Sequence, residues 1–323
     1  MAKGAMRARI ALLALLAAVA MLVAACGSDS GNSSSGGNGG GSGASSSGQP
    51  GKGKPALTIG TKDFTEEFVL GQLYKQALEA KGYKVNYKEN IGATEIIDKA
   101  LTSNKIDAYP EYTGVSLSVV AGKDTLTKSA AETASLVKKF YEGRGQVVSE
   151  PTPFQDTDAL ATTKAFASKN QLAQVSDLSK LPSFTLGARP EFKSRFNGLK
   201  GMEKEYGVKN AKFKQIALGL QYPSLDKGNV DVANVFSTDA QLSSGKYALL
   251  KDPKGIFGFQ NVYFVINKDK YQALGGQQFM DVINSVNKLL TGPAIQSMNA
   301  AVDLDKKEPA AVAKAFLQAN NLL

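Results

Sequence analysis

The chain has 323 residues, with 38 Lys and Arg against 29 Asp and Glu, a formal net charge of +9. It contains no histidine, no tryptophan and one cysteine, which excludes His/Cys metal sites, Ser-His-Asp triads and Cys-His pairs. Hydrophobic residues make up 43% of the chain, enough for a packed core, and the basic residues are too scattered to follow nucleic acid. Composition therefore favours a binding protein, with no catalytic residue, cofactor or nucleic-acid partner expected.

Residues 1–26 are predicted to be a lipoprotein signal peptide. Three basic residues precede an apolar run over residues 10–25, which is short for a membrane-spanning helix. The run ends in Leu-Val-Ala-Ala-Cys, a lipobox pattern that places the single cysteine at Cys26. We expect lipidation of Cys26 and an anchored position on the outer face of the bacterial cytoplasmic membrane. Residues 27–55, rich in Gly and Ser, are predicted to be a flexible tether.

Strand and helix patterns alternate in the next part of the chain. Predicted strands cover residues 56–60, 83–87 and 105–108, and predicted helices cover residues 68–78 and 94–101. Asp63 and Glu66 resemble a capping box ahead of the first helix. The β-α-β-α-β order predicts an α/β lobe with a mainly parallel sheet.

A second lobe is predicted over residues 157–261, and the first lobe takes residues 56–156 and 262–323. The expected strands of the second lobe cover residues 159–163, 184–187 and 230–235. After the return to the first lobe, a strand is predicted over residues 263–266 and amphipathic helices over residues 279–290 and 309–317.

Two segments in different lobes weakly match each other. Residues 104–108 precede Glu111-Tyr112-Thr113, and residues 228–233 precede the polar loop 236–239. Ligands of open α/β sheets bind beyond the carboxyl ends of strands, so both loops are candidates to face one cleft. Asp107 and Asp231, inside the matching segments, are interpreted as local hydrogen-bonding groups.

Three segments of the first lobe resemble the binding proteins of osmoprotectant importers, which take glycine betaine, choline, carnitine and related quaternary amines. They are residues 59–66 (IGTKDFTE), 78–83 (LEAKGY) and 106–114 (IDAYPEYTG). The likeness extends over nearly everything from Leu57 onward. It implies a type II periplasmic-binding-protein-like α/β fold, with two lobes joined by two crossings that close on a small-molecule solute without catalysis. The implied partner is an ABC transporter permease, and we expect a monomer.

The resemblance also implies a set of ligand-binding residues. Tyr112 fits one position of a tyrosine cage, in which ring faces attract a quaternary ammonium. Lys62, expected at the rim of the cleft, and Arg195 fit positions that pair with a ligand carboxylate.

Four further positions depart from the family pattern. Asp158, Phe236 and Gln260 stand where cage tyrosines are expected, and Val115 stands where a polar residue is common. The amide of Gln260 both donates and accepts hydrogen bonds, and Asp158 can accept from hydroxyls or pair with a cation. A receptor for a polyhydroxylated or aromatic solute therefore stays open as an alternative. So do a local capping role for Asp158 and a core position for Phe236.

Two other classes of protein also stay open. An enzyme on the same scaffold would use Asp158 and Glu111 as paired carboxylates, although the missing histidine and the predicted lipid anchor count against it. A sensor lipoprotein would bind the ligand without feeding a transporter.

Overall fold

The computed structural model describes residues 49–323. The predicted signal peptide with Cys26, and the predicted tether up to residue 48, lie outside the described residues. The last residues assigned to the tether are ordered, because Gly51 is buried and its N–H donates to the carbonyl of Lys81 at 2.9 Å. A side chain at Gly51 would collide with the backbone of Tyr83, so glycine suits this close approach.

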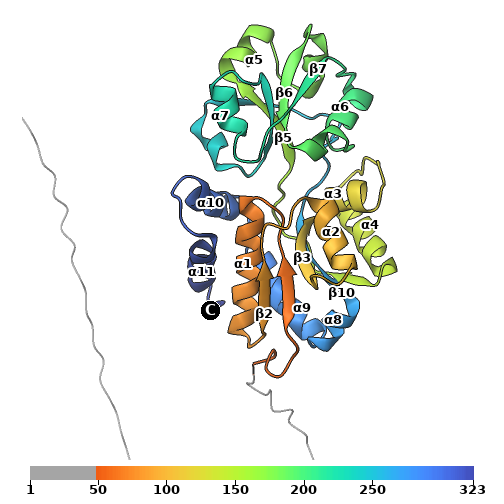
Figure 1. Cartoon of the computed structure of the whole chain (residues 1–323), viewed down its shortest axis with the longest axis vertical. Coiled ribbons are helices and arrows are strands. Elements are labelled where there is room, and N and C mark those ends of the chain that lie inside the picture. The colour runs from red at the N-terminus through yellow and green to blue at the C-terminus, as the bar shows by residue number, and fades with distance from the viewer. Residues whose placement is uncertain (1–48) are drawn as a thin grey trace, which may run out of the picture. The chain divides into compact units, whose positions relative to one another are not determined.

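Two five-stranded sheets form the centres of two lobes (Figure 1). In the first lobe the sheet order is β2-β1-β3-β10-β4, and in the second it is β7-β6-β8-β5-β9. The strands of the first lobe are β1 (Leu57–Gly60), β2 (Val85–Lys88), β3 (Ala108–Tyr112), β4 (Gln146–Val148) and β10 (Val262–Asn267). Those of the second are β5 (Asp158–Thr163), β6 (Phe184–Ala188), β7 (Ala211–Gln215), β8 (Val232–Phe236) and β9 (Tyr247–Leu250).

Helices cover the sheets. The first lobe has α1 (Thr65–Ala80), α2 (Thr94–Thr102), α3 (Thr113–Val115), the π-helical η1 (Ser116–Val120), α4 (Ala130–Gly143), α8 (Lys268–Ala273), α9 (Gln277–Asn287), α10 (Gly292–Asp303) and α11 (Pro309–Ala319). The second lobe has α5 (Lys164–Asn170), η2 (Val175–Lys180), η3 (Pro190–Lys193), α6 (Leu199–Tyr206), α7 (Gln221–Asp226) and η4 (Ala240–Ser244). This two-lobed α/β arrangement confirms the predicted fold class.

Both sheets are mixed. In the first lobe β1 runs parallel to β2 and β3, as predicted, whereas β10 runs antiparallel to β3 and β4. In the second lobe β6 runs parallel to β7 and β8, and β5 runs antiparallel to β8 and β9. The predicted strand over 105–108 is displaced, since β3 begins at Ala108 and is buried along its length. Pro110 inside β3 is a poor strand former, which hid the strand from the sequence pattern.

Asp107 and Asp231 occupy matching positions in the two sheets. The carboxylate of Asp107 accepts the backbone N–H of Thr58 at 2.7 Å, and that of Asp231 accepts the backbone N–H of Thr185 at 2.7 Å. Both residues were interpreted as local hydrogen-bonding groups, but their partners lie 49 and 46 residues away in the chain. The weak sequence match corresponds to equivalent strands, β3 and β8.

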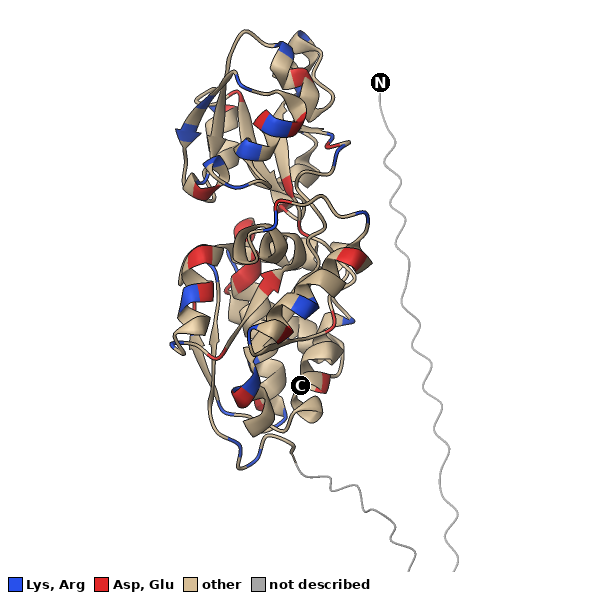
Figure 2. Cartoon of the chain, turned by 90° about the vertical axis from the view of Figure 1, so that its right-hand side faces the viewer, with Lys and Arg blue, Asp and Glu red and all other residues tan. Residues whose placement is uncertain are grey.

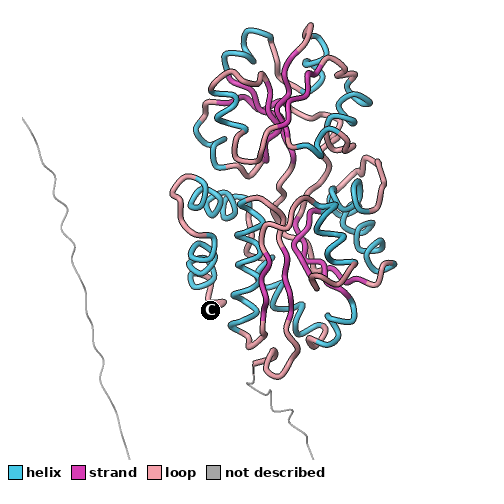
Figure 3. The backbone as a smooth tube through the Cα atoms, in the orientation of Figure 1, coloured by secondary structure: helices cyan, strands magenta, loops and turns pink. Residues whose placement is uncertain are grey.

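The chain crosses between the lobes twice, through segments without helix or strand (Figure 3). Gln155 and Asn261 form an antiparallel bridge there, and the N–H of Asp156 donates to the carbonyl of Gln260 at 3.1 Å. The crossings therefore lie side by side, as a hinge requires.

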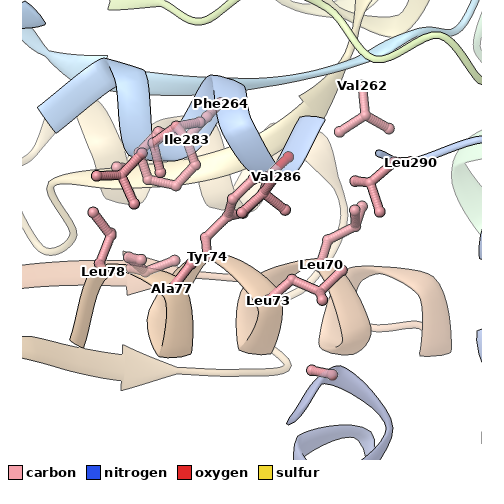
Figure 4. Packing of buried hydrophobic residues seen from close by; sticks show 14 of the residues in the cluster. Leu70, Leu73, Tyr74, Ala77, Leu78, Val262, Phe264, Ile283, Val286 and Leu290 are labelled. Carbon is pink, nitrogen blue, oxygen red and sulfur yellow. The ribbon is translucent and has the colours of Figure 1, made fainter. Parts of the chain in front are cut away.

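Helix α1 fixes the core of the first lobe. Its buried face, which includes Leu70 and Tyr74, packs against Val286 of α9 and Phe264 of β10 (Figure 4). The Tyr74 hydroxyl donates to the Asn287 side chain at 2.6 Å, so this buried hydroxyl is satisfied. The core thus holds the amino end of α1 at the edge of the lobe that faces the crossings.

Candidate functional site

The carboxyl ends of β1, β3, β6 and β8 meet at one cavity between the lobes. The space between its lining atoms is about 450 Å³, including the part open to solvent. All seven residues predicted for the site line it: Lys62, Tyr112, Val115, Asp158, Arg195, Phe236 and Gln260. The lining also contains residues that were not predicted for the site: Asp63, Phe64, Ala93, Thr94, Asp156, Arg189, Glu191 and Leu218.

A row of three aromatic rings crosses the cavity. The Phe64 ring stacks on the Phe236 ring with centroids 5.2 Å apart and planes 19° apart. The centroid of the Phe64 ring also lies 6.1 Å from the centroid of the Tyr112 ring. Phe64 and Tyr112 belong to the first lobe and Phe236 ends β8 of the second, so the row joins the lobes. Phe64 lies shortly after the end of the strand predicted over residues 56–60. That position beyond a strand end was the signal that could have identified it as a site residue.

Lys62 is buried rather than at the rim. Its side chain lies between two buried carboxylates, in an ion pair with Glu111 and 3.7 Å from Glu67. Its ammonium also stands 4.3 Å from the centroid of the Tyr112 ring. Burial raises the pKa of Glu67 to about 8 despite the nearby ammonium, and Glu111 makes the closer ion pair with Lys62.

The predicted capping box at the start of α1 is wrong. Phe64 is the N-cap residue and no side chain caps the helix. The Glu66 carboxylate instead accepts hydrogen bonds from the Tyr112 hydroxyl at 2.8 Å, the Thr238 hydroxyl at 2.6 Å and the Asn299 amide at 3.0 Å. Because Thr238 follows β8, Glu66 connects the two lobes directly.

Asp156 belongs to the same buried network, where it accepts the Thr238 N–H at 3.2 Å. Burial raises the pKa of Glu66 and of Asp156, and the nearby Glu66 carboxyl group raises the pKa of Asp156 further.

Asp158 forms a buried ion pair within the second lobe. The Arg189 guanidinium donates to both carboxylate oxygens of Asp158, at 2.8 Å and 3.0 Å, and to the Asn234 side chain at 2.8 Å. The central carbon of the Arg189 guanidinium lies 4.9 Å from the Phe236 ring centroid. The carboxylate of Asp158 is therefore already paired with a cation of the protein. Arg189 comes directly after β6, the same strand-end signal as for Phe64.

Arg195 spans the cleft. Its Nε and Nη2 donate to the two carboxylate oxygens of Glu95, at 3.1 Å and 2.7 Å, and Glu95 belongs to α2 of the first lobe. The side chain that was expected to meet a ligand carboxylate thus meets a carboxylate of the other lobe.

Gln260 is held by the backbone. Its amide oxygen accepts the Val115 N–H at 3.0 Å, and its amide nitrogen donates to the Phe257 carbonyl at 2.7 Å. A side chain at Gly114 would overlap the Gln260 amide, so the close approach there needs glycine. Hydrogen bonds to the backbone of Val115 and Phe257 therefore hold the Gln260 side chain in the wall of the cavity.

The carboxylates proposed for an enzyme do not form a pair. Glu111 is bonded to Lys62 and is absent from the cavity lining, whereas Asp158 is bonded to Arg189 in the other lobe. Within residues 49–323 no group of acidic residues and cysteine is arranged to hold a metal ion. Among the helices of this described part, none combines the length and the apolar character that a bilayer crossing needs.

Comparisons with known proteins fit this architecture. A family model described as the substrate binding domain of ABC-type glycine betaine transport system matches residues 55–319. The chain is 33% identical over 279 residues to a glycine-betaine-binding protein of Pseudomonas aeruginosa, across 83% of this chain and 88% of that one.

Two further comparisons concern a transport protein and a solved structure. The chain is 29% identical to the ergothioneine transport permease/ergothioneine binding protein EgtU of Helicobacter pylori, across 81% of this chain and 47% of that one, so it spans about half of that relative. A solved structure of a glycine betaine/carnitine/choline ABC transporter component aligns with a TM-score of 0.66 at 24% identity, across 82% of this chain and 99% of that one. The last likeness concerns the fold alone.

Proposed function

Because the chain belongs to the family of substrate-binding domains of ABC-type glycine betaine transport systems, we propose that it captures an osmoprotectant-like solute for an ABC importer. Its relatives are extracytoplasmic solute-binding proteins of transporters rather than enzymes. The proposed ligand is glycine betaine, choline or a related quaternary amine, held between the lobes and handed to the permease. We also prefer a transport role to a sensor role, because the family is described as part of a transport system.

One observation carries the proposal at the level of the site. Side chains from both lobes line a single cavity at the carboxyl ends of the strands, next to two adjacent crossings. A ligand in such a cavity contacts both lobes only when they are closed, so binding and closure are coupled.

The position of the protein in the cell is part of the proposal. We infer that Cys26 carries the lipid, that residues after it tether the folded part, and that the receptor works as a monomer on the outer face of the cytoplasmic membrane. The support is the lipobox pattern and the extracytoplasmic location of the family's binding proteins.

The alternative ligand class, a polyhydroxylated or aromatic solute, has one observation in its favour. Two rings that would receive a quaternary ammonium are each contacted by a cation of the protein, Lys62 at Tyr112 and Arg189 at Phe236. A ring face that already carries a cation is less available to a second one.

Calorimetry with the processed protein tests both classes. We expect glycine betaine to bind, and Tyr112→Ala to weaken it by about 1 to 2 kcal/mol, since a desolvated cation over a ring gains about that much. Tyr247→Ala, outside the cavity lining, is the matched control. Binding of a polyol or phenol instead, weakened by Asp158→Ala, would favour the alternative, and no binding of any of these solutes would refute the proposal.

A further inference from the structure

The cations that line the cavity are already neutralised by carboxylates of the protein. The pairs are Lys62 with Glu111, Arg189 with Asp158, and Arg195 with Glu95. Charged residues of both signs accordingly gather where the two lobes meet (Figure 2). Among the described residues, the cavity lining therefore offers no unpaired cation to the carboxylate of a ligand.

The carboxyl groups of the lining are not balanced in the same way. Four of them line the cavity: Asp63, Asp156, Asp158 and Glu191. Asp158 and Glu191 share the Arg189 guanidinium, at 2.8 Å and 3.0 Å. Within residues 49–323 neither Asp63 nor Asp156 forms an ion pair. The charge that stays unpaired in the lining is thus negative.

One oxygen of Asp156 opens into the cavity. Asp156 is 5% exposed and lines both this cavity and an adjoining one on the side of α10. Its Oδ1 accepts the Thr238 N–H at 3.2 Å and the Ser237 hydroxyl at 3.3 Å. Its Oδ2 has no donor in the part of the chain that the structure describes, and it is not one of the polar atoms enclosed by protein. Oδ2 is therefore available to a ligand.

The charges around Asp156 are mostly negative. Burial raises its pKa, and the nearby carboxyl groups of Glu66 and Asp239 raise it further. The Arg189 guanidinium acts on Asp156 from the end of β6, but it already pairs with two other carboxylates. An ionised carboxylate in such a place is costly unless a cation compensates its charge. A cationic ligand supplies that compensation.

From these observations, and resting on the transport function proposed above, we propose that Asp156 selects the charge of the ligand, and that the ligand is an organic cation without a carboxylate. Its cationic group meets Asp156 Oδ2 in the space that Phe64 and Phe236 also line. Protein cations already face two of the rings, so a carboxylate supplies the attraction that those ring faces lack. A zwitterion such as glycine betaine desolvates its own carboxylate there without gaining an ion pair, which disfavours it.

Three ligands of similar size and different charge test the selection in the unaltered protein. We would titrate choline, glycine betaine and the neutral carbon analogue of choline, in which a tert-butyl group replaces the trimethylammonium group, into the processed protein. Choline is expected to bind about tenfold or more tightly than either of the others.

The outcomes separate this inference from the transport function. Glycine betaine that binds as tightly as choline overturns the charge selection and leaves the transport function standing. A neutral analogue that binds as tightly as choline also overturns the selection. If neither choline nor glycine betaine binds, both the selection and the proposed transport function fail.

A matched pair of variants tests the assignment to Asp156. Asp156→Asn removes the charge and keeps the shape, whereas Asp226→Asn changes an exposed carboxylate of α7 that accepts the Tyr247 hydroxyl at 2.9 Å, outside both cavities. Asp156→Asn is expected to weaken choline about tenfold and glycine betaine much less, so that the preference is lost. Asp226→Asn is expected to leave both affinities unchanged. Equal choline affinities for the two variants would overturn the role of Asp156.

Discussion

The ion pair between Glu95 and Arg195 is expected to contribute to ligand affinity, although Glu95 does not line the cavity. It joins α2 of the first lobe to the segment after η3 of the second, so opening of the lobes must break it. Glu95→Gln removes the charge and keeps the shape of the side chain. The variant therefore perturbs the closed form selectively.

The size of the effect follows from the geometry. Two charge-assisted hydrogen bonds, at 3.1 Å and 2.7 Å, involve an Arg195 side chain that is 7% exposed and a Glu95 side chain that is 47% exposed. Because nearly half of the Glu95 side chain meets solvent, screening reduces the contribution to about 1 kcal/mol. A closed form less stable by that amount lowers the apparent affinity about fivefold.

Calorimetric titration of glycine betaine into Glu95→Gln, Arg195→Met and the double variant measures this coupling. The control is Asp98→Asn, which breaks a comparable pair with Arg144, 3.0 Å long, inside the first lobe. We expect the control to keep full affinity, and the effect of Glu95→Gln to shrink at high salt. If Glu95→Gln binds glycine betaine as tightly as the control does, the pair does not stabilise the closed form.

Two further outcomes are expected. Cys26→Ser should release the protein from membranes to the soluble fraction; continued sedimentation with membranes would disprove the anchor. Glu67→Gln should flatten the pH dependence of the free energy of unfolding between about pH 5 and pH 8. In that window the folded chain keeps the Glu67 proton, with a pKa of about 8, while the unfolded chain has released it, so stability falls as pH rises, by about 1.4 kcal/mol per pH unit at most. The free energy of unfolding is measured by urea titrations at several pH values. The same pH dependence with and without the substitution would contradict this expectation.

The strands and the ends of strands were within reach of the sequence. Short apolar segments located β1, β5, β6 and β8, and the rule that ligands lie beyond carboxyl ends of strands directed attention to the loops after β3 and β8. Family resemblance added positions that the structure brings to one cavity. Such signals are local, and each needs only a few neighbouring residues.

The contacts of the site residues could not be predicted from the sequence. Lys62 was expected at the rim, as a charge that acts on the ligand from the edge of the cleft, but Glu111 and Glu67, on other elements, draw it inside. Glu95 gave no separate signal, and Arg189 gave only its position at a strand end. Their roles depend on contacts with Arg195 and Asp158 far along the chain. Charge pairs formed by tertiary structure leave no periodic trace in the sequence.

The position of β10 limits the order in which the two sheets can be completed. It lies between β3 and β4 in the first sheet, yet it is made only after the whole second lobe. Until residue 267 has reached the compartment where the chain folds, β4 has no partner strand and the buried edge of β3 stays uncovered. The second lobe is a continuous segment, so it can complete its sheet first, and the first lobe closes last around the helices at the end of the chain.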